Sequence, residues 1–496
     1  MTGKSVIVVG AGIGGLSLAC QLAHRGFAVR VLEKNSSCGG RARTWRREGF
    51  TFDMGPSWYL MPEVFDRFFE SLGTSRERLY SLRRLDPSYR VFFSNNGFTD
   101  ITTDETSNRA AFDGFEPGGG RLLERYLADA RYKYETAMRE FVYREYSNLG
   151  QFLNRRMLLE GIRLNVLGSL DRHVRRYFHD RRSRQILEYH MVFLGSSPYN
   201  APGMYAILSH VDLRQGVFYP DGGMGTVVGA LERLARSSGV EVLVDQEVTG
   251  IETTGRRARG VRVRGGEVFE ADVVAVNADY AFTETRLLDR RSRSIPERAW
   301  KRKTLAPSFF ILYLGLSKRL ARPLHHTLYL APDWDRHFDD IFKHPAWPLN
   351  PCFYLSCTSK TDPTVAPPGG ETVTILVPVA CGLPDTDDMR RRYRDLLVRH
   401  VETVLGERIA DSISVERVYS PRDFRADYNA YNGTGLGLAH TLPQTAVFRP
   451  PHRSRKLDNL YYTGAYTHPG VGVPMALISS QLVAARIEKE GRNDER

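Results

Sequence analysis

Short apolar runs alternate with glycine-rich turns in the first part of the chain. Residues 5–9 (SVIVV) are a β-branched run, which predicts a buried strand. A helical pattern follows over 16–26 (LSLACQLAHRG), and residues 27–34 (FAVRVLEK) predict a second strand. The order strand, helix, strand is typical of a βαβ unit, in which both strands lie parallel in one sheet.

The middle of the chain repeats this alternation and then changes in character. Residues 219–253 have the pattern of a glycine turn, a helix and a strand, and residues 266–280 that of a further strand and turn. Apolar runs within 306–330 and 351–379 predict two strands each, which indicates a second sheet. Residues 120–193 instead have a helical pattern rich in Tyr, Leu and Arg.

The chain closes on a constrained apolar segment, NLYYTGAYTHPGVGVPMALISSQLVAARI (459–487). Residues 460–463 predict a strand, and Gly464-Ala465 and Pro469-Gly470 predict turns. A helix follows, with Pro474 in its first turn, where the missing N–H group is no loss. Such a helix directs the positive end of its dipole at whatever lies beside the turn.

Three glycines make the first βαβ unit a candidate dinucleotide site. Gly10 permits a tight turn, Gly12 lets the backbone approach a pyrophosphate, and Gly15 lets the helix lie close to the strand. The helix N-terminus offers N–H donors to the phosphates. Glu33 ends the second strand, where an acid accepts hydrogen bonds from a ribose. Because strand, helix and acid accompany the glycines, we interpret the motif as a nucleotide site rather than as a turn without a ligand.

The residues that follow resemble the FAD-containing superfamily of amine oxidases, protoporphyrinogen oxidase and carotenoid desaturases. The resemblance is carried by Gly39-Gly40-Arg41 and by FDMGPSW (52–58). It implies that the first motif lies along the pyrophosphate and flavin, that the second passes near the isoalloxazine ring, and that FAD is bound rather than NAD. The motif and the resemblance together predict these FAD contacts: Gly10, Ala11, Gly12, Gly14, Gly15, Glu33, Lys34, Gly39, Gly40, Arg41, Gly55, Pro56, Ser57, Val248, Asn277, Ala278, Gly464, Ala465, Gly472 and Val473.

The C-terminal third of the chain restricts this resemblance to one group within the superfamily. YYTGAYTHPGVGVPMALISSQLVA and the preceding DFRADYNAYNGTGLGLAHTLPQT are similar to the closing segments of phytoene desaturases and related bacterial-type carotenoid desaturases. This family implies desaturation of a long apolar polyene, with phytoene as the expected substrate, by hydride transfer to flavin N5. Quinone or oxygen is the expected electron acceptor.

The same resemblance implies an α/β fold, with a Rossmann-like FAD-binding domain and a second α+β substrate domain that combines a mixed sheet with helices. The FAD-binding domain is expected to be discontinuous, over residues 1–75, 205–285 and 415–496. Residues 76–204 and 286–414 are expected to form the substrate-binding and membrane-facing region, with its helical part over about 120–195.

Composition and charge limit the kinds of molecule that we expect the protein to bind. The chain has 496 residues and a formal net charge of +12, mostly from Arg, but no zinc-finger or RNA-binding motif, so we expect no nucleic acid. Residues 154–185 carry nine Arg among apolar residues at helical spacing, which fits either a solvated basic helix or a helix on an anionic membrane surface. The five cysteines show no metal or disulfide spacing, and a cytoplasmic, peripheral membrane-associated protein is expected.

The catalytic residues are the least determined part of the prediction. His468 is a weak candidate for the proton acceptor and His440 a second, while the adjacent His325 and His326 are poorly disposed for one metal, and no metal is expected. The sequence leaves four functions open: a carotenoid desaturase of C40 or C30 chains, a carotenoid isomerase or saturase, an FAD amine oxidase, and a non-enzymatic prenyl-chain binding protein.

Overall fold

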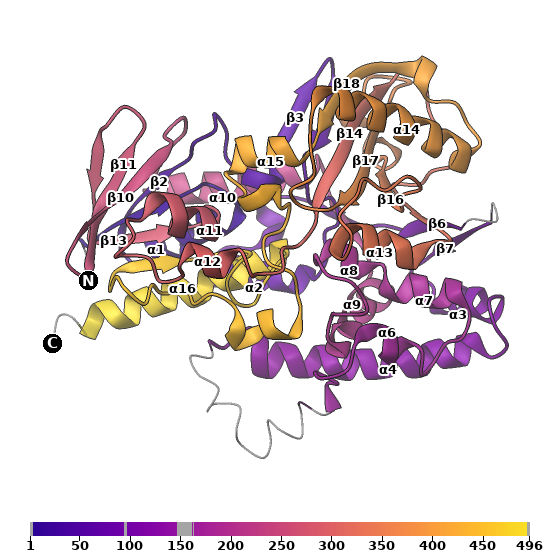
Figure 1. Cartoon of the computed structure of the whole chain (residues 1–496), viewed down its shortest axis with the longest axis horizontal. Coiled ribbons are helices and arrows are strands. Elements are labelled where there is room, and N and C mark those ends of the chain that lie inside the picture. The colour runs from indigo at the N-terminus through magenta and orange to yellow at the C-terminus, as the bar shows by residue number, and fades with distance from the viewer. Residues whose placement is uncertain (1–2, 94–96, 146–160, 162, 494–496) are drawn as a thin grey trace.

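The computed structural model describes residues 3–93, 97–145, 161 and 163–493. A five-stranded parallel sheet forms the centre of one lobe, which also carries both chain ends (Figure 1). Its strands, in spatial order, are β19 (Leu460–Tyr462), β13 (Val273–Val276), β1 (Ser5–Val9), β2 (Ala28–Leu32) and β9 (Glu241–Leu243). Three segments far apart in the sequence therefore share one sheet.

The two faces of this sheet are covered by different elements. Val6 and Val8 of β1 pack with helices α1 (Ile13–His24), α10 (Met224–Ser237) and α16 (Val473–Asn493). The alternate residues, Ile7 and Val9, pack with the antiparallel sheet formed by β10 (Val248–Thr254), β11 (Arg257–Val263) and β12 (Val268–Glu270). A strand buried on both faces is apolar at every position, which explains the unbroken SVIVV run.

The second lobe is built on a seven-stranded mixed sheet (Figure 1). Its strands, in spatial order, are β18 (Ile413–Tyr419), β14 (Ser308–Leu316), β17 (Glu371–Val379), β16 (Phe353–Ser356), β15 (His326–Leu330), β6 (Tyr89–Phe93) and β7 (Phe98–Ile101). Only β15 and β6 pair in parallel. All nine residues of the central strand β14 are buried.

Helices cover one side of this second sheet (Figure 1). They are α3 (Glu105–Asp113), α4 (Gly119–Ala137), α6 (Leu170–Val174), α7 (Arg181–Glu188), α8 (His190–Phe193) and α9 (Ile207–His210). The remaining elements are β3 (Thr44–Arg47), β4 (Phe50–Asp53), α2 (Pro62–Glu70), β5 (Leu82–Arg84), β8 (Phe218–Pro220), α11 (Tyr280–Phe282), α12 (Glu297–Trp300), α13 (Trp334–Phe342), α14 (Asp387–Leu405) and α15 (Pro421–Tyr428).

The predicted α/β fold with a second mixed sheet is confirmed, whereas the bounds of the two predicted domains stay a prediction. One local expectation is wrong: residues 154–185 do not form a continuous helix in their described part. Turns and bends occupy 164–168, Ser169 forms an isolated β-bridge with Pro202, and α6 and α7 are separate short helices. Residues 154–160 and 162 lie outside the described part. Among the helices of the described ranges, none combines the length and apolar composition needed to cross a bilayer.

Candidate active site

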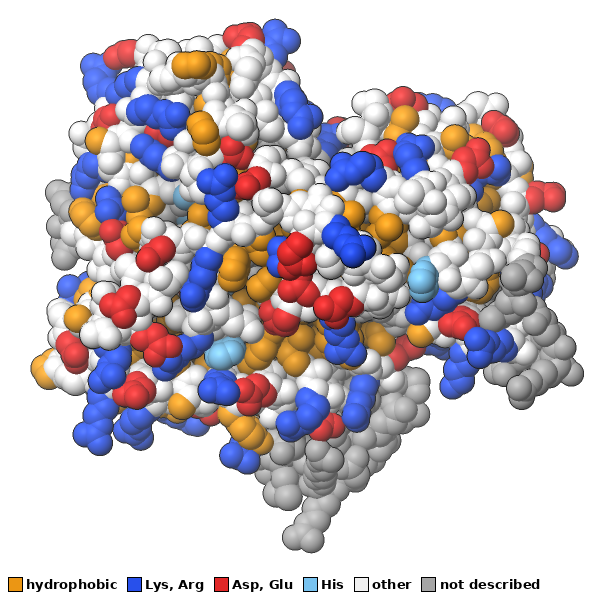
Figure 2. Space-filling view, turned by 180° about the vertical axis from the view of Figure 1, so that it is seen from behind, with side chains coloured by type: hydrophobic (Ala, Val, Ile, Leu, Met, Phe, Trp, Pro, Cys, Tyr) orange, Lys and Arg blue, Asp and Glu red, His pale blue; other side chains and the backbone are white. Residues whose placement is uncertain are grey.

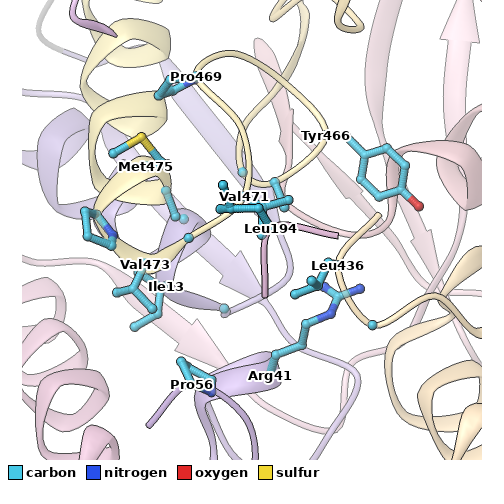
Figure 3. A pocket seen from close by; sticks show the side chains of 18 of the residues that line it. Ile13, Arg41, Pro56, Leu194, Leu436, Tyr466, Pro469, Val471, Val473 and Met475 are labelled. Carbon is cyan, nitrogen blue, oxygen red and sulfur yellow. The ribbon is translucent and has the colours of Figure 1, made fainter. Parts of the chain in front are cut away.

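One cavity of about 1430 Å³ lies between the two lobes and extends through both. All the predicted FAD contacts line it except Ala11 and Gly15, and His468 lines it as well. Figure 3 shows part of this space, where Ile13 and Arg41 of the N-terminal segment and Val473 of the C-terminal segment lie around Leu194, which follows α8 of the second lobe. The middle segment of the parallel sheet's lobe contributes Val276, Asn277 and Ala278 to the lining. A single small-molecule site usually measures about 300–1,000 Å³, so this volume leaves room for a dinucleotide and a second ligand.

The two glycine loops lie against each other at one end of the cavity. Gly12 and Gly39 form a parallel bridge, and the Gly39 N–H donates to the Ala11 carbonyl at 2.8 Å. Gly10 has a φ of 98°, which few other residues adopt. A Cβ on Gly15 would lie 1.9 Å from the Gly10 carbonyl oxygen. Ala11 and Gly15 therefore support the loop from behind rather than facing the cavity.

The predicted acid Glu33 also faces the cavity and is 4% exposed. Its Oε2 accepts from the Ala11 N–H at 2.8 Å, and its Oε1 accepts from the Asn35 backbone and side-chain amides at 2.9 and 2.8 Å. Among the described residues, Oε2 accepts only the bond from the Ala11 N–H and therefore keeps a second lone pair for a ligand hydroxyl. Lys34 lines the cavity too, but its ammonium donates to the Ala426 carbonyl and the Asn429 side chain, at 2.7 and 3.1 Å.

Arg41 provides the test of whether an anionic cofactor fits. It lies in the cavity wall (Figure 3), with its guanidinium carbon 5.4 Å from the centre of the Tyr428 ring. Its Nε and Nη2 atoms are buried without a hydrogen-bond partner. Unmet guanidinium donors beside two glycine loops match a phosphate, which accepts two parallel N–H bonds. The residues present therefore fit the pyrophosphate of FAD.

The C-terminal turn forms another wall of the cavity. Gly464 and Gly472 have φ values of 103° and 124°, and α16 begins at Val473, directly beside the cavity. The Gly464 N–H donates to the Ser479 hydroxyl at 3.1 Å, which attaches the turn to the helix. The predicted arrangement of strand, turn and helix is confirmed, and the positive end of a 21-residue helix faces this part of the cavity.

The part of the cavity inside the second lobe is apolar. Its lining includes Leu194, Met204, Leu208, Phe309, Ile311 and Leu376. Two cavity-lining residues are large, hydrophobic and exposed: Leu167 at 85% and Phe448 at 47%. On one face of the molecule hydrophobic side chains gather in a hollow with charged side chains around it (Figure 2). An apolar interior that reaches exposed apolar residues suits a long hydrocarbon ligand.

A buried polar cluster in this apolar part was missed by sequence reasoning. Asp212 Oδ2 accepts from the Tyr89 hydroxyl at 2.6 Å and the Tyr189 hydroxyl at 3.1 Å, and lies 3.0 Å from His190 Nε2. His190 and Tyr189 line the cavity, and His190 Nδ1 is buried without a hydrogen-bond partner. No local motif signals this cluster, because its members come from three separate elements.

The cluster lies close to the predicted flavin segment. Trp58, which follows Pro56 and Ser57, has its ring centre 6.0 Å from that of Tyr189 and 5.1 Å from that of Tyr89. An imidazole oriented by a carboxylate, with its second nitrogen free, is the arrangement of a general base. The structure therefore offers a proton acceptor at the wall next to this segment.

The histidines singled out from the sequence have other partners. His468 Nε2 lies 3.2 Å from the carbonyl oxygens of both Phe141 and Val142, and burial, followed by the charge of His452, lowers its pKa to about 4. His440 Nδ1 lies 2.8 Å from the Leu194 carbonyl oxygen, and burial is the main cause that lowers its pKa to about 3. Both rings are neutral at pH 7, and a role of His468 as proton acceptor stays a prediction.

Comparison with known proteins gives the chain its context. The family described as flavin containing amine oxidoreductase matches residues 13–488. The chain is 45% identical to a carotenoid 3,4-desaturase of Haloarcula japonica over 98% of both chains. It is 36% identical to a zeta-carotene-forming phytoene desaturase of Myxococcus xanthus, over 98% of this chain and 94% of the relative.

Solved structures with the same fold are more distant in sequence. An oxidoreductase of Methanosarcina mazei has a TM-score of 0.62 at 18% identity, with 98% of this chain and 100% of that chain covered. A putrescine oxidase bound to putrescine has a TM-score of 0.61 at 15% identity, with 98% and 99% covered. At these identities the likeness concerns the fold alone.

Proposed function

The chain belongs to the flavin-containing amine oxidoreductase family, and we propose that within it this enzyme uses FAD to desaturate a carotenoid, a long apolar polyene. The observation that carries the proposal is the continuity of the cavity. The loops that fit a dinucleotide and the apolar wall inside the second lobe line the same space. An amine oxidase needs a polar route for a charged substrate, whereas Leu167 and Phe448 make this opening apolar.

When bound, FAD supplies the hydride acceptor, which no side chain can provide. The residues of the chain hold and orient the two ligands. Arg41 and the loops at Gly12 and Gly39 hold the phosphates, and Glu33 holds the ribose. The apolar wall excludes water from the reacting carbons.

His190 receives the proton in this proposal. Its Nε2 is held by Asp212, so Nδ1 is the nitrogen available to accept a proton from the polyene carbon that lies next to the hydride donor. Asp212 is 1% exposed and has no Lys or Arg within 4.0 Å among the described residues. A carboxylate at hydrogen-bond distance stabilises a protonated imidazole.

We further propose that the apolar opening docks on an anionic membrane, from which the polyene enters. Exposed Leu167 and Phe448 at the opening support this, together with the exposed side chains of Arg172 and Arg176 in and after α6. A polyene of this length dissolves in bilayers and not in water, so direct uptake from the membrane avoids transfer through water.

The docking proposal is tested with Leu167→Ser combined with Phe448→Ser. Each buried Leu or Phe side chain contributes about 1.5–3 kcal/mol, so binding to phosphatidylglycerol vesicles in a sedimentation assay is expected to fall at least about 10-fold. Leu349→Ser is the matched control, because Leu349 is 75% exposed but does not line the cavity. If the double variant and the Leu349→Ser control lose vesicle binding equally, or if neither loses it, docking at this opening is contradicted.

The function itself is tested by incubating the FAD-loaded enzyme with phytoene, or with a partly conjugated carotene, in liposomes. Quinone or oxygen serves as the electron acceptor, and products are separated by chromatography. Desaturation lengthens the conjugated system and, without an acceptor, bleaches the flavin absorbance. Conversion without bleaching indicates an isomerase, and bleaching by an amine alone indicates an amine oxidase; either result overturns the proposal.

A further inference from the structure

Arg449 is buried beneath the C-terminal turn and is 4% exposed. Its Nε donates to the carbonyl oxygens of Tyr466 and Thr467, at 3.2 and 3.1 Å. Its Nη1 and Nη2 donate to the carbonyl oxygens of Gln444 and Ala465, at 3.3 and 2.5 Å. All four acceptors are neutral backbone groups.

The charge of Arg449 has no counter-ion in the described part of the chain. No carboxylate there lies within 4.0 Å of it, and the acid near the adjoining His452, Glu145, is paired with Arg486. Arg390 is a contrasting case: its side chain is 11% exposed, and Asp423 lies 2.7 Å from its guanidinium. Removing a cation from water without an opposite charge costs several kcal/mol, so an unpaired Arg449 is a feature that needs an explanation.

The charge acts on its neighbours. Burial lowers the pKa of Arg449 to about 10, so it stays protonated at pH 7. Burial is also the main cause of the low pKa values of His440 and His468, and repulsion from Arg449 contributes to both. The two histidines therefore stay neutral and leave Arg449 as the source of positive potential at the turn.

The turn separates Arg449 from the cavity. Ala465, Tyr466 and His468 line the cavity, whereas Arg449 does not. The N-terminus of α16 brings further positive potential to the same wall. A wall with a buried, unneutralised cation and a helix N-terminus matches a ligand that becomes negatively charged in place.

We propose that Arg449 stabilises the reduced, anionic flavin relative to the oxidised, neutral flavin and so raises the reduction potential of the bound cofactor. The inference rests on the proposed function and on the predicted FAD contacts at Gly464 and Ala465, which line the cavity and put the flavin beside this turn. Arg449 acts through the backbone of residues 465–467 and does not contact the reacting atoms. It is thus a positioning residue with an electrostatic effect.

If Arg449 had a purely structural role, it would fasten the turn without affecting the reduction potential of the flavin. Arg449→Lys and Arg449→Gln distinguish the two roles, because both lose the forked guanidinium but only Lys keeps the charge. Arg390→Gln is the control for loss of a largely covered Arg that is paired with a carboxylate. FAD affinity is measured for every variant, so that failure to place the flavin is recognised separately from failure of the electrostatic effect.

Two readouts need no substrate. Sulfite adds to the oxidised flavin and leaves a negative charge on the ring, so its dissociation constant reports stabilisation of that charge. For Arg449→Gln we expect sulfite binding at least about 10-fold weaker and a two-electron reduction potential lower by about 30 mV for each factor of ten. For Arg449→Lys and Arg390→Gln we expect a sulfite dissociation constant within about threefold of the wild-type value. Their reduction potentials should differ from that of the wild type by no more than the shift that corresponds to this threefold change.

If Arg449→Lys and Arg449→Gln change sulfite binding and the reduction potential equally while FAD stays bound, the proposal is overturned. The role of Arg449 is then to fasten the turn. If Arg449→Gln does not fold, Arg449→Met is judged by the same criteria. None of these measurements depends on which polyene is the substrate.

Discussion

Gly12 gives the most direct test of the cofactor placement, because its own backbone tolerates a side chain. Its φ and ψ of −70° and 176° are ordinary extended values. A Cβ there would meet only the Asn277 Oδ1 atom, at 2.9 Å, which a small side-chain movement relieves. We therefore expect Gly12→Ala to fold and to place a methyl group where the pyrophosphate approaches the loop.

The magnitude follows from the contact that the methyl group disturbs. A hydrogen bond from a backbone N–H to a charged phosphate contributes about 1.5–3 kcal/mol, so loss of one such bond weakens FAD binding about 10- to 150-fold. Titration of the apoprotein with FAD, followed by flavin fluorescence, measures the change. The thermal unfolding temperature of the apoprotein is expected to change by no more than about 2 °C.

Gly229→Ala is the matched control, because Gly229 lies in α10, does not line the cavity and meets only the flexible Arg233 side chain at 3.2 Å. It should bind FAD like the wild type. A folded Gly12→Ala protein with unchanged FAD affinity would show that the pyrophosphate does not lie on this loop, and the placement of the whole cofactor would have to be abandoned.

Two further predictions concern buried groups of the second lobe. Burial, and then the charge of Asp171, raises the pKa of Glu188 from 4.5 to about 8. The contribution of Glu188 to the stability of the native state is therefore fully present below pH 4.5 and is lost as the pH rises through about 8, by ~5 kcal/mol in all. Glu188→Gln should therefore unfold several degrees higher than the wild type at pH 8.5 and at the same temperature at pH 4.5; a gain that is independent of pH contradicts this reasoning. His190→Gln should lower the rate of anaerobic flavin reduction by the polyene about 10²- to 10⁴-fold and remove its pH dependence while FAD affinity is kept. A loss below tenfold would exclude His190 as the proton acceptor.

The parts that the sequence predicts well are those whose signal is local. Residues 5–9 become β1, and the run at 306–330 becomes β14 and β15, because strands that are buried on both faces are rich in apolar residues. The glycine loops were found because a tight turn and a close backbone approach leave little choice of residue. Arg41 followed from the resemblance, and the structure adds its unmet donors.

The expectation of one basic helix over 154–185 is wrong because it rests on the helical spacing of apolar residues and ignores the residues that cap helices. The Ser169 hydroxyl accepts from the Arg172 N–H at 3.3 Å and begins α6, and Asp180 accepts from the Arg182 N–H at 2.7 Å and begins α7. Ser and Asp are frequent helix N-caps, so both starts had a readable signal. The pairing of His190 with Asp212 had none, because it arises only when distant segments pack together.

A buried cation and a buried acidic side chain lie at two different walls of the cavity. Arg449 lies behind the C-terminal turn that borders the proposed flavin position, and Asp212 holds His190 at the apolar wall. If a hydride moved from the polyene to FAD, negative charge would move toward the wall with Arg449, and positive charge would be left at the wall with Asp212. Because both charges are fixed before the reaction, the protein need not reorganise to stabilise this separation. Burying either ion without a partner costs free energy, and this cost is offset when the charges of the reaction develop beside the two ions.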